Sequence, residues 1–173
     1  VTKCGIVFPC ENRLQYTSHH YDQSRKHIIK SAERSLKNMG TDYLDLLLIH
    51  RPSPFMDPAE ISEAFRELYQ SGKVRNFGVS NFKSSQFELL SSYLDYPLVT
   101  NQVEISPLKL DVFQDGTLDH LMTRGLYPMA WSPLAGGDLF RGDGERVQKV
   151  QKALLDIGEK YGETRLDTLA YAF

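Results

Sequence analysis

Residues 43–50, Tyr-Leu-Asp-Leu-Leu-Leu-Ile-His, decide how the fold of this chain is interpreted. The run from Leu46 to Ile49 is apolar on both faces and ends at the polar His50. A strand that is apolar on both faces is typical of a parallel sheet, which is covered on both sides. The run is also far shorter than the roughly 20 apolar residues that cross a bilayer. We therefore interpret residues 43–50 as a buried strand that brings a histidine to the edge of a parallel sheet.

Short apolar runs alternate with longer amphipathic runs on both sides of this strand. The expected strands cover residues 1–8, 43–50, 74–80, 99–104 and 126–131. The expected helices cover residues 24–40, 57–71, 84–93, 116–124 and 145–161, with a further helix from 164, and the expected loops cover 10–22 and 132–144. Strands that alternate with helices in this way predict an α/β fold with a parallel sheet.

Two helix starts can be located from their capping residues. Ser24 is expected to cap a helix that ends at Gly40 and presents one apolar face, formed by Ile28, Ile29, Ala32, Leu36 and Met39. Asp57 is expected to cap the next helix, with Pro58 at its first position and the Glu60 carboxylate closing a capping box.

Polar or aromatic side chains follow the apolar runs at the ends of four expected strands, namely His50, Ser80, Gln102 and Trp131. In a parallel barrel the carboxyl ends of all strands build one shared site, whereas a doubly wound sheet concentrates its chemistry at one Gly-rich turn. The chain has no G-x-G-x-x-G motif. We therefore favour a parallel (β/α)8 TIM barrel. Eight units occupy about 250 residues, so residues 1–173 are expected to be the central part of one barrel domain, truncated at both ends.

Charge and cysteine content exclude several function classes. The formal net charge is −2 and the sequence pI is about 6.2, so we expect neither a nucleic-acid partner nor binding to an acidic membrane. Two cysteines cannot build a disulfide framework, which suits a cytoplasmic protein. Cys10, His19 and His20 match no zinc spacing, and we expect no metal. Cys4 is expected to be a small buried hydrophobic residue.

Five motifs in order resemble the aldo-keto reductases. They are residues 2–5 (TKCG), 47–52 (LLIHRP), 78–82 (GVSNF), 101–107 (NQVEISP) and 130–137 (AWSPLAGG). The resemblance covers essentially the whole chain, and it implies hydride transfer between NADP(H) and a carbonyl or alcohol substrate. In the family a tyrosine protonates the carbonyl oxygen, a lysine lowers the pKa of that tyrosine, an aspartate holds the lysine, and a histidine orients the carbonyl.

The resemblance assigns catalytic roles to Lys3, as the lysine, and His50, as the histidine. The tyrosine and aspartate of the family belong to a preceding strand and loop, before Val1, and Tyr16 and Tyr21 do not match that tyrosine. A tyrosine with an ordinary pKa near 10 is a poor acid at neutral pH, so a cationic neighbour is the physical remedy.

The resemblance also assigns residues to the cofactor. Ser80, Asn81 and Gln102 would bind the nicotinamide carboxamide, and Trp131 would stack on the ring. Backbone N–H groups of Ser132, Leu134, Ala135 and Gly136 would meet the pyrophosphate, and Arg141 is a further candidate for the phosphates. The preference for NADP over NAD is a family expectation, because the 2′-phosphate site would lie beyond Phe173.

Simpler interpretations compete with these assignments. Lys3 could be a surface charge, His50 a structural histidine and Trp131 a core residue. Ser80 is not a nucleophile elbow, because G-x-S-x-G fails where position 82 is Phe. For the protein as a whole, the alternatives to a reductase acting on a small carbonyl substrate are a cofactor-binding regulatory or sensor subunit and a non-catalytic remnant. The last is disfavoured, because five strands cannot close and would leave unpaired edges.

Overall fold

The computed structural model describes residues 1–11 and 17–173, and it divides into two compact units. Unit 1 comprises Val1–Asn101 and Gly125–Tyr127, and unit 2 comprises Gln102–Arg124 and Pro128–Phe173. Tyr16 and part of the expected loop 10–22 lie outside the described residues, and the expectation of one domain over residues 1–173 stays a prediction.

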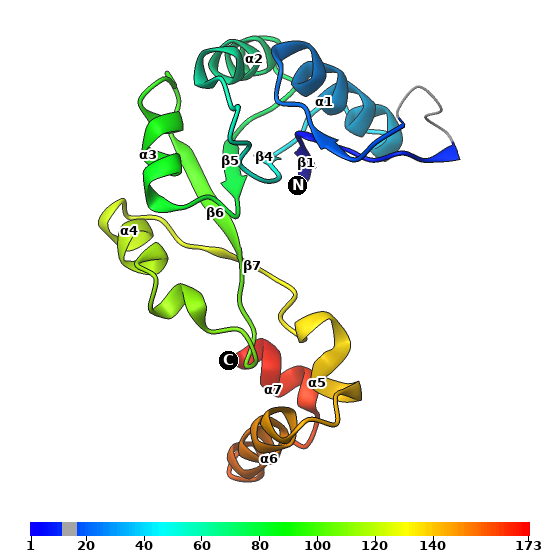
Figure 1. The fold of residues 1–173 in the computed structure, drawn as a ribbon, viewed down its shortest axis with the longest axis vertical. Coiled ribbons are helices and arrows are strands. Elements are labelled where there is room, and N and C mark those ends of the chain that lie inside the picture. Colours follow the sequence, from blue (N-terminus) through cyan, green and yellow to red (C-terminus); the bar gives the residue numbers. More distant parts are fainter. Residues whose placement is uncertain (12–16) are drawn as a thin grey trace. The chain divides into compact units, whose positions relative to one another are not determined.

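The parallel strands of unit 1 are β1 (Thr2–Cys4), β4 (Leu47–Ile49), β5 (Phe77–Ser80) and the first part of β6 (Leu98–Glu104) (Figure 1). Their order is β1-β4-β5-β6. The register aligns three rows across the first three strands, Thr2–Leu47–Phe77, Lys3–Leu48–Gly78 and Cys4–Ile49–Val79. The parallel sheet expected from the sequence is therefore confirmed, and all three residues of β4 are fully buried, as its unbroken apolar run predicted.

Three helices of unit 1 follow their strands: α1 (Arg25–Met39), α2 (Pro58–Gln70) and α3 (Ser84–Ser91). Helices α1 and α2 lie side by side, and α1 also contacts β1 (Figure 1). The Ser24 hydroxyl accepts a hydrogen bond from the N–H of His27 at 3.3 Å, and α1 ends at Gly40 with φ 62°. Asp57 caps α2 by accepting from the N–H of Ala59 at 2.9 Å. Both helix starts are confirmed.

Two details of these helices differ from expectation. Met39, expected on the apolar face of α1, is 49% exposed, because it lies in the last turn, where the helix runs out of neighbouring apolar surface. Glu60, expected to close a capping box within α2, accepts a 2.9 Å hydrogen bond from the backbone N–H of Arg25 in the first turn of α1. The carboxylate thus joins two helices, and this contact depends on tertiary packing that local sequence does not encode.

A short antiparallel pair interrupts the segment between β1 and α1. Strand β2 (Ile6–Val7) pairs with β3 (His20–Tyr21) in the register Ile6–Tyr21 and Val7–His20. The sequence predicted a loop for residues 10–22, and β3 corrects that prediction. Both residues of β3 are exposed, so no alternation of apolar and polar side chains marked them. Backbone pairing with β2 is what makes them a strand.

The core of unit 1 lies between its sheet and its helices. Phe65 of α2 stacks on Phe77 of β5 with ring centroids 4.0 Å apart, and both side chains are about 1% exposed. Gly78 is a residue that must lack a side chain. A Cβ there would lie 2.7 Å from Cδ2 of Leu48 and 2.9 Å from the carbonyl oxygen of Thr100. The neighbouring strands therefore pack tightly against β5 at this position.

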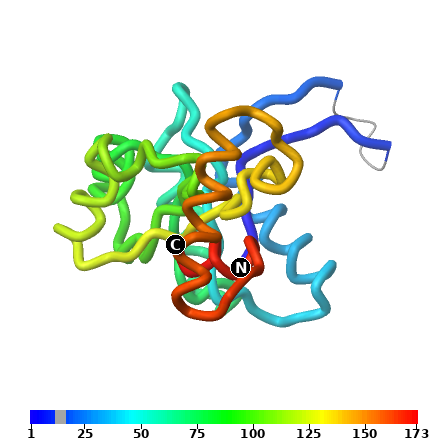
Figure 2. The backbone as a smooth tube through the Cα atoms, turned by 90° about the horizontal axis from the view of Figure 1, so that it is seen from below, coloured from blue at the N-terminus to red at the C-terminus, as the bar shows by residue number. Residues whose placement is uncertain are grey.

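In unit 2 the later residues of β6 pair in parallel with β7 (Met129–Trp131), in the register Gln102–Met129 and Glu104–Trp131. The helical elements are η2 (Asp111–Phe113), α4 (Thr117–Thr123), η3 (Ala135–Gly137), α5 (Asp138–Arg141), α6 (Glu145–Glu159) and α7 (Leu166–Ala172). Helices α6 and α7, orange and red in Figure 2, contact each other, and a small core gathers Leu139, Leu154 and Ala170.

The expected loop 132–144 contains η3 and α5, which corrects that prediction. Its glycines hid the short helix, because Gly136 and Gly137 have positive φ and interrupt the helical pattern. Leu139 of α5 is fully buried. The burial of Leu139 stabilises α5, a single turn of helix that is too short to be stable by helix propensity alone.

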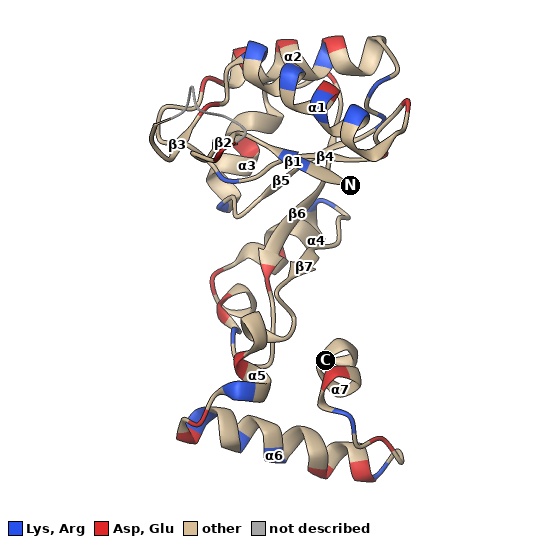
Figure 3. Ribbon diagram, turned by 90° about the vertical axis from the view of Figure 1, so that its right-hand side faces the viewer, with Lys and Arg blue, Asp and Glu red and all other residues tan. Residues whose placement is uncertain are grey.

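Lys, Arg, Asp and Glu residues are spread along α1 and α2 (Figure 3). Arg25 pairs with Glu67, and Lys73 pairs with Glu33 at 2.7 Å. These side chains are well exposed, so each pair contributes little to stability. No helix among residues 1–11 and 17–173 is long and apolar enough to cross a membrane.

Candidate functional site

In unit 1 the ends of β4 and β5 are tied together by the residues that the sequence singled out. The side-chain amide of Asn81 donates hydrogen bonds to the main-chain carbonyl of His50, at 3.2 Å, and to the hydroxyl of Ser80, at 2.9 Å. Asn81 adopts φ 60°, a conformation that asparagine tolerates better than most residues. The left-handed turn directs the amide of Asn81 back toward β4.

Lys3 and His50 face the same side of the sheet as Ser80. Lys3 is in register with Leu48 and Gly78, and His50 and Ser80 follow two residues later on their own strands. Since side chains alternate along a strand, these residues share one face. Phe77 faces the other side, where it stacks on α2. The structure thus brings Lys3, His50, Ser80 and Asn81 together on one part of unit 1.

The environment of His50 keeps its imidazole neutral. Burial lowers the pKa of His50 below its ordinary 6.5, and the positive charges of Lys3 and Arg51 lower it further. Lys3 itself is exposed among the described residues. At neutral pH His50 therefore carries a neutral ring, which donates one hydrogen bond without bringing a charge.

The backbone beyond β5 is held by Asn101, whose role sequence reasoning missed. Its side-chain nitrogen donates to the carbonyl of Phe82 at 2.7 Å, and its side-chain oxygen accepts from the N–H of Phe82 at 3.4 Å. Asn101 is 2% exposed. The two bonds clamp the turn that follows Ser80 and Asn81. An asparagine in a buried strand position, next to the assigned Gln102, was the available signal.

In unit 2, Gln102 and Trp131 lie on the same face of the paired strands. Gln102 is in register with Met129, and Trp131, two residues further along, is in register with Glu104. Gln102 is 9% exposed and Trp131 is partly exposed. A tryptophan that keeps part of its ring accessible is better placed for stacking than a fully buried core residue. Their assignment to a cofactor stays a prediction.

The loop after β7 folds back on itself through an unusual run of left-handed residues. Ser132, Ala135, Gly136 and Gly137 have φ of 55°, 53°, 65° and 97°. The Ser132 hydroxyl accepts from the N–H of Gly136 at 2.9 Å, and its carbonyl accepts from the N–H of Ala135 at 2.8 Å. The N–H of Gly137 also donates to the carbonyl of Leu134 at 3.0 Å, so the N–H groups of Ala135, Gly136 and Gly137 all form hydrogen bonds within the loop. Their expected contact with a pyrophosphate stays a prediction.

Arg141 reaches across this loop. Its guanidinium donates to the carbonyl of Gly136 at 3.0 Å, and a Cβ on Gly137 would lie 2.5 Å from Nη2 of Arg141. Glycine is therefore favoured at position 137 by its φ of 97°, whereas the Arg141 guanidinium lies at the end of a flexible side chain and could shift to make room for a Cβ. Ser132, Leu134, Ala135, Gly136 and Arg141 lie in one loop and the short helix that follows it in unit 2, and their assignment to the cofactor phosphates stays a prediction.

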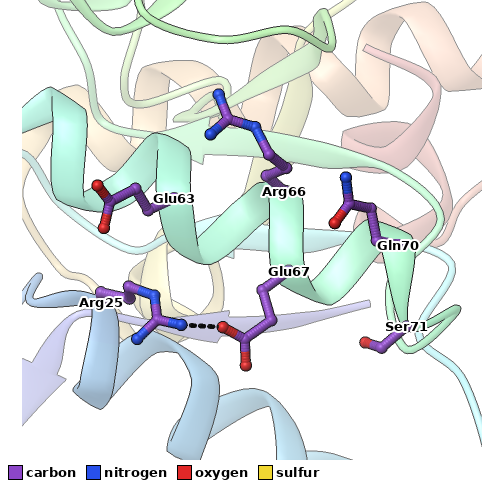
Figure 4. Close-up of a pocket in the computed structure, with 6 residues that line it drawn as sticks. All are labelled: Arg25, Glu63, Arg66, Glu67, Gln70 and Ser71. Atoms are coloured by element: carbon purple, nitrogen blue, oxygen red, sulfur yellow. Dashed lines mark hydrogen bonds and ion pairs between the residues drawn. The ribbon is translucent and has the colours of Figure 1, made fainter.

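A surface hollow of unit 1 lies beside its helices α1 and α2. It has a volume of about 610 Å³ and is lined by Arg25, Glu63, Arg66, Glu67, Gln70 and Ser71 (Figure 4). Arg25 is paired with Glu67, and Arg66 binds Asp95 at 2.7 Å. The residues come from α1 and α2, on the side of the sheet opposite His50. Balanced and mutually paired charges indicate a solvated helix surface, and we assign it no ligand.

Cys4 lies beside the site without taking part in it. Burial raises the pKa of its thiol to about 12, and its Sγ lies 3.7 Å from the carbonyl oxygen of Leu48. The thiol is therefore protonated and inert at neutral pH, as the expectation of a small buried residue implied. Among residues 1–11 and 17–173, no group of His, Cys, Asp and Glu side chains is arranged to hold a metal ion.

The whole chain, residues 1–173, matches the sequence profile of the Aldo/keto reductase family. It is 50% identical over 173 residues to an uncharacterized oxidoreductase, YcsN, of Bacillus subtilis, which covers 100% of this chain and 58% of that protein. It is 51% identical over 162 residues to a 6-dehydroglucose reductase of Agrobacterium fabrum, which covers 94% of this chain and 54% of that protein. The chain therefore belongs to the aldo/keto reductase family. It spans little more than half the length of these relatives.

Solved structures of aldo-keto reductases are similar to this chain. A thermostable aldo-keto reductase, Tm1743, crystallised with the inhibitor epalrestat, superimposes with a TM-score of 0.72 at 32% identity, over 81% of this chain and 48% of that one. The aldo-keto reductase of Bombyx mori in complex with NADP gives a TM-score of 0.67 at 30% identity, over 82% and 48%. These similarities and the parallel strands confirm the expected α/β class and fit part of a TIM barrel.

Proposed function

We propose that the protein is an NADP(H)-dependent carbonyl reductase, in which Lys3 and His50 serve the chemistry at the carbonyl oxygen. One observation carries the proposal: Lys3, His50 and Ser80 share one face of neighbouring strands, with Lys3 close enough to lower the pKa of His50. A 6-dehydroglucose reductase among the relatives supports an aldehyde or ketone substrate.

His50 is proposed to orient the carbonyl, because a neutral imidazole donates a hydrogen bond to the carbonyl oxygen without placing a positive charge beside it. Lys3 is proposed to lower the pKa of a tyrosine that the family supplies from another part of the barrel. A cation beside a phenol stabilises the phenolate, so the tyrosine can give and regain its proton at neutral pH. His50 and Lys3 therefore act at the carbonyl oxygen and on the proton that this oxygen receives.

The residues of both units fit a nicotinamide cofactor by their chemistry. The loop from Ser132 to Gly137 is proposed to meet the cofactor phosphates, and the Arg141 guanidinium supplies a cation to this loop through its hydrogen bond to the carbonyl of Gly136. Ser80, Asn81 and Gln102 offer the donors and acceptors that a carboxamide requires, and Trp131 offers a ring for stacking. When bound, the cofactor supplies the hydride. A relative solved with NADP supports this cofactor.

The partner proposed for the protein is a small carbonyl compound, with no role for nucleic acid or membrane. The cytoplasm is the proposed location. Its support is the pair of free cysteines, Cys4 and Cys10, which a reducing compartment maintains.

Two substitutions in the full-length protein test the catalytic roles. His50→Ala and Lys3→Met should each lower kcat for a generic aldehyde by a factor of roughly 10² or more, the scale of a lost acid–base group, while NADPH binding persists. Lys30→Met, on an exposed position of α1, is the matched control and should leave kcat unchanged. Parent activity in either site variant would refute the assignment. NADPH binding without turnover in the parent protein would favour the regulatory-subunit alternative.

Trp131 gives an independent test of the cofactor assignment. If the ring stacks on nicotinamide, NADPH should quench its fluorescence, and Trp131→Ala should weaken NADPH binding by about 1–3 kcal/mol. Trp131→Tyr should restore most of that affinity. A core tryptophan would instead lose about 3–5 kcal/mol of folding stability on truncation, with unchanged affinity for NADPH.

A further inference from the structure

The backbone directly after His50 is held by a side chain from a distant part of unit 1. Nε2 of Gln23 donates a 2.5 Å hydrogen bond to the main-chain carbonyl of Arg51, 28 residues further along the chain. Gln23 is only 8% exposed. A hydrogen bond shielded from water is stronger and more directional than one on the surface. The contact therefore fixes the Arg51 peptide, and with it the residue before it.

Gln23 occupies its place because Gly5 leaves room for it. Gly5 follows β1 with φ 93°, and a Cβ there would lie 3.3 Å from Cγ of Gln23 and 3.8 Å from Cγ2 of Ile49. The carbonyl of Gly5 also accepts from the N–H of Asp22 at 3.2 Å. Gln23 is thus packed between the turn that follows the Lys3 strand and the strand that ends at His50.

The position of Gln23 in the chain makes a buried amide unexpected. It directly precedes Ser24, the N-cap of α1, where an apolar residue commonly packs against the first turn of the helix. An amide at a buried position costs free energy unless it forms hydrogen bonds. Nε2 of Gln23 donates to Arg51, whereas its Oε1 is buried without a hydrogen-bond partner among the described residues. The bond to Arg51 is therefore what offsets the cost of burying this amide.

Three hydrogen bonds from three different segments converge on the His50–Arg51 backbone. The N–H of His50 donates to the carbonyl of Cys4 at 2.9 Å, the amide of Asn81 donates to the carbonyl of His50 at 3.2 Å, and Gln23 donates to the carbonyl of Arg51. The first is a normal bond of the parallel sheet. The other two come from side chains outside the strands: Gln23 precedes His50 in the chain, and Asn81 follows it.

We propose that Gln23 is a positioning residue for His50, whose amide fixes the backbone from which the imidazole projects. The proposal rests on the proposed function, in which His50 orients the carbonyl. Gln23 acts through the Arg51 peptide and does not itself touch the substrate. Without its amide, the turn after β4 keeps the Asn81 bond and gains freedom on the Arg51 side, so the imidazole becomes more mobile and more accessible to water.

The test uses the full-length protein with Gln23→Met, which keeps the size of the side chain and removes its N–H, and Gln23→Asn, whose amide is one methylene too short. Gln70→Met, at an exposed position of α2, is the matched control. The His50 pKa, followed by NMR of the ring protons, should rise toward 6.5 in both Gln23 variants, because burial is the largest cause of its depression. The value of kcat should fall about ten- to a hundredfold, while the Kd for NADPH stays within about twofold of the parent.

The outcomes separate the two proposals. An unchanged His50 pKa in either folded Gln23 variant overturns the positioning role, whatever happens to kcat. A raised pKa with the expected fall in kcat supports it. A raised pKa in a protein whose parent shows no reductase activity supports the positioning of His50 and refutes the proposed function instead. If Gln23→Met fails to fold, Gln23→Asn alone decides.

Discussion

The side-chain amide of Asn81 reaches from the end of β5 to the main-chain carbonyl of His50 at the end of β4, over 3.2 Å. It does so from a backbone with φ 60°. The strand ends that carry the proposed catalytic and cofactor residues are therefore joined by a side chain, beyond the last bond of the sheet. The geometry of one strand end depends on the residue chosen at the other.

Asn81 should tolerate glycine better than a β-branched residue. Asn81→Gly keeps the left-handed backbone and loses the two side-chain bonds, at a cost of about 1–3 kcal/mol. Asn81→Val loses the same bonds and adds roughly 1–2 kcal/mol of strain, because its Cβ disfavours positive φ. Urea unfolding of both variants measures the difference. Equal stabilities would show that the turn relaxes to another conformation.

The pKa of His50 should respond to the charge of Lys3. Lys3→Met should raise it toward 6.5 without reaching that value, because burial is the larger cause of the depression. Arg51→Met should act in the same direction, and Lys30→Met should leave the His50 titration unchanged. NMR titration of the ring protons reads out all three variants. If the His50 pKa did not change in Lys3→Met, the two residues would not interact electrostatically, and the proposed site would lose support.

The same depression makes stability depend on pH. The unfolded chain protonates His50 near 6.5, whereas the folded protein does so at a lower pH. Between the two values the unfolded state binds more protons, so the free energy of unfolding falls as the pH falls through this window. Above pH 6.5 the contribution is fully present. His50→Gln should flatten this part of the stability profile, which denaturant melts between pH 5 and about 7.5 would show.

Gly78→Ala should be destabilising because of space rather than backbone conformation. Its Cβ would meet Leu48 and the Thr100 carbonyl below 3 Å, and such overpacking costs about 1–3 kcal/mol. Leu48→Val removes the nearest flexible atom, so the double variant should lose less stability than the sum of the single variants.

Gly40→Ala is the contrasting case. Nothing lies within 4 Å of a Cβ there, but φ is 62°, so the cost is about 1 kcal/mol of backbone strain. Its effect should add to that of Leu48→Val. If the effects of Gly78→Ala and Leu48→Val were also additive, the cost of Gly78→Ala would come from the backbone and not from packing.

The two cysteines should differ in reactivity toward iodoacetamide. Cys10 is exposed, whereas Cys4 is buried with a pKa raised to about 12. At pH 8 the folded protein should be alkylated at Cys10, while Cys4 reacts only after denaturation. Peptide mass spectrometry locates the labels. Rapid native labelling of Cys4 would show that β1 opens readily, which would also disturb Lys3 beside it.

Local signals in the sequence were sufficient for most helices and strands. Ser24 and Asp57 mark helix starts by side-chain bonds to residues two or three positions away, and such short-range contacts do not need a tertiary fold. The apolar run of β4 predicted burial on both faces, and its three residues are fully buried. Of the polar residues at strand ends, His50 and Ser80 lie on one face of unit 1, and the expected rim that they share with Gln102 and Trp131 stays a prediction.

What the tertiary structure decided are the contacts between residues far apart in the chain. The pairing of β2 with β3, the bond from Arg25 to Glu60, and the bond from Gln23 to Arg51 left no periodic trace in the sequence. Each depends on two segments meeting at a particular distance and angle, which hydrophobic pattern and capping rules do not specify. The lowered pKa of His50 is of the same kind, since burial and the nearby charge of Lys3 exist only once β1 lies beside β4. The sequence alone determined which groups are available for chemistry, and packing determined their environment, because desolvation and Coulomb interactions depend on distance in space and not along the chain.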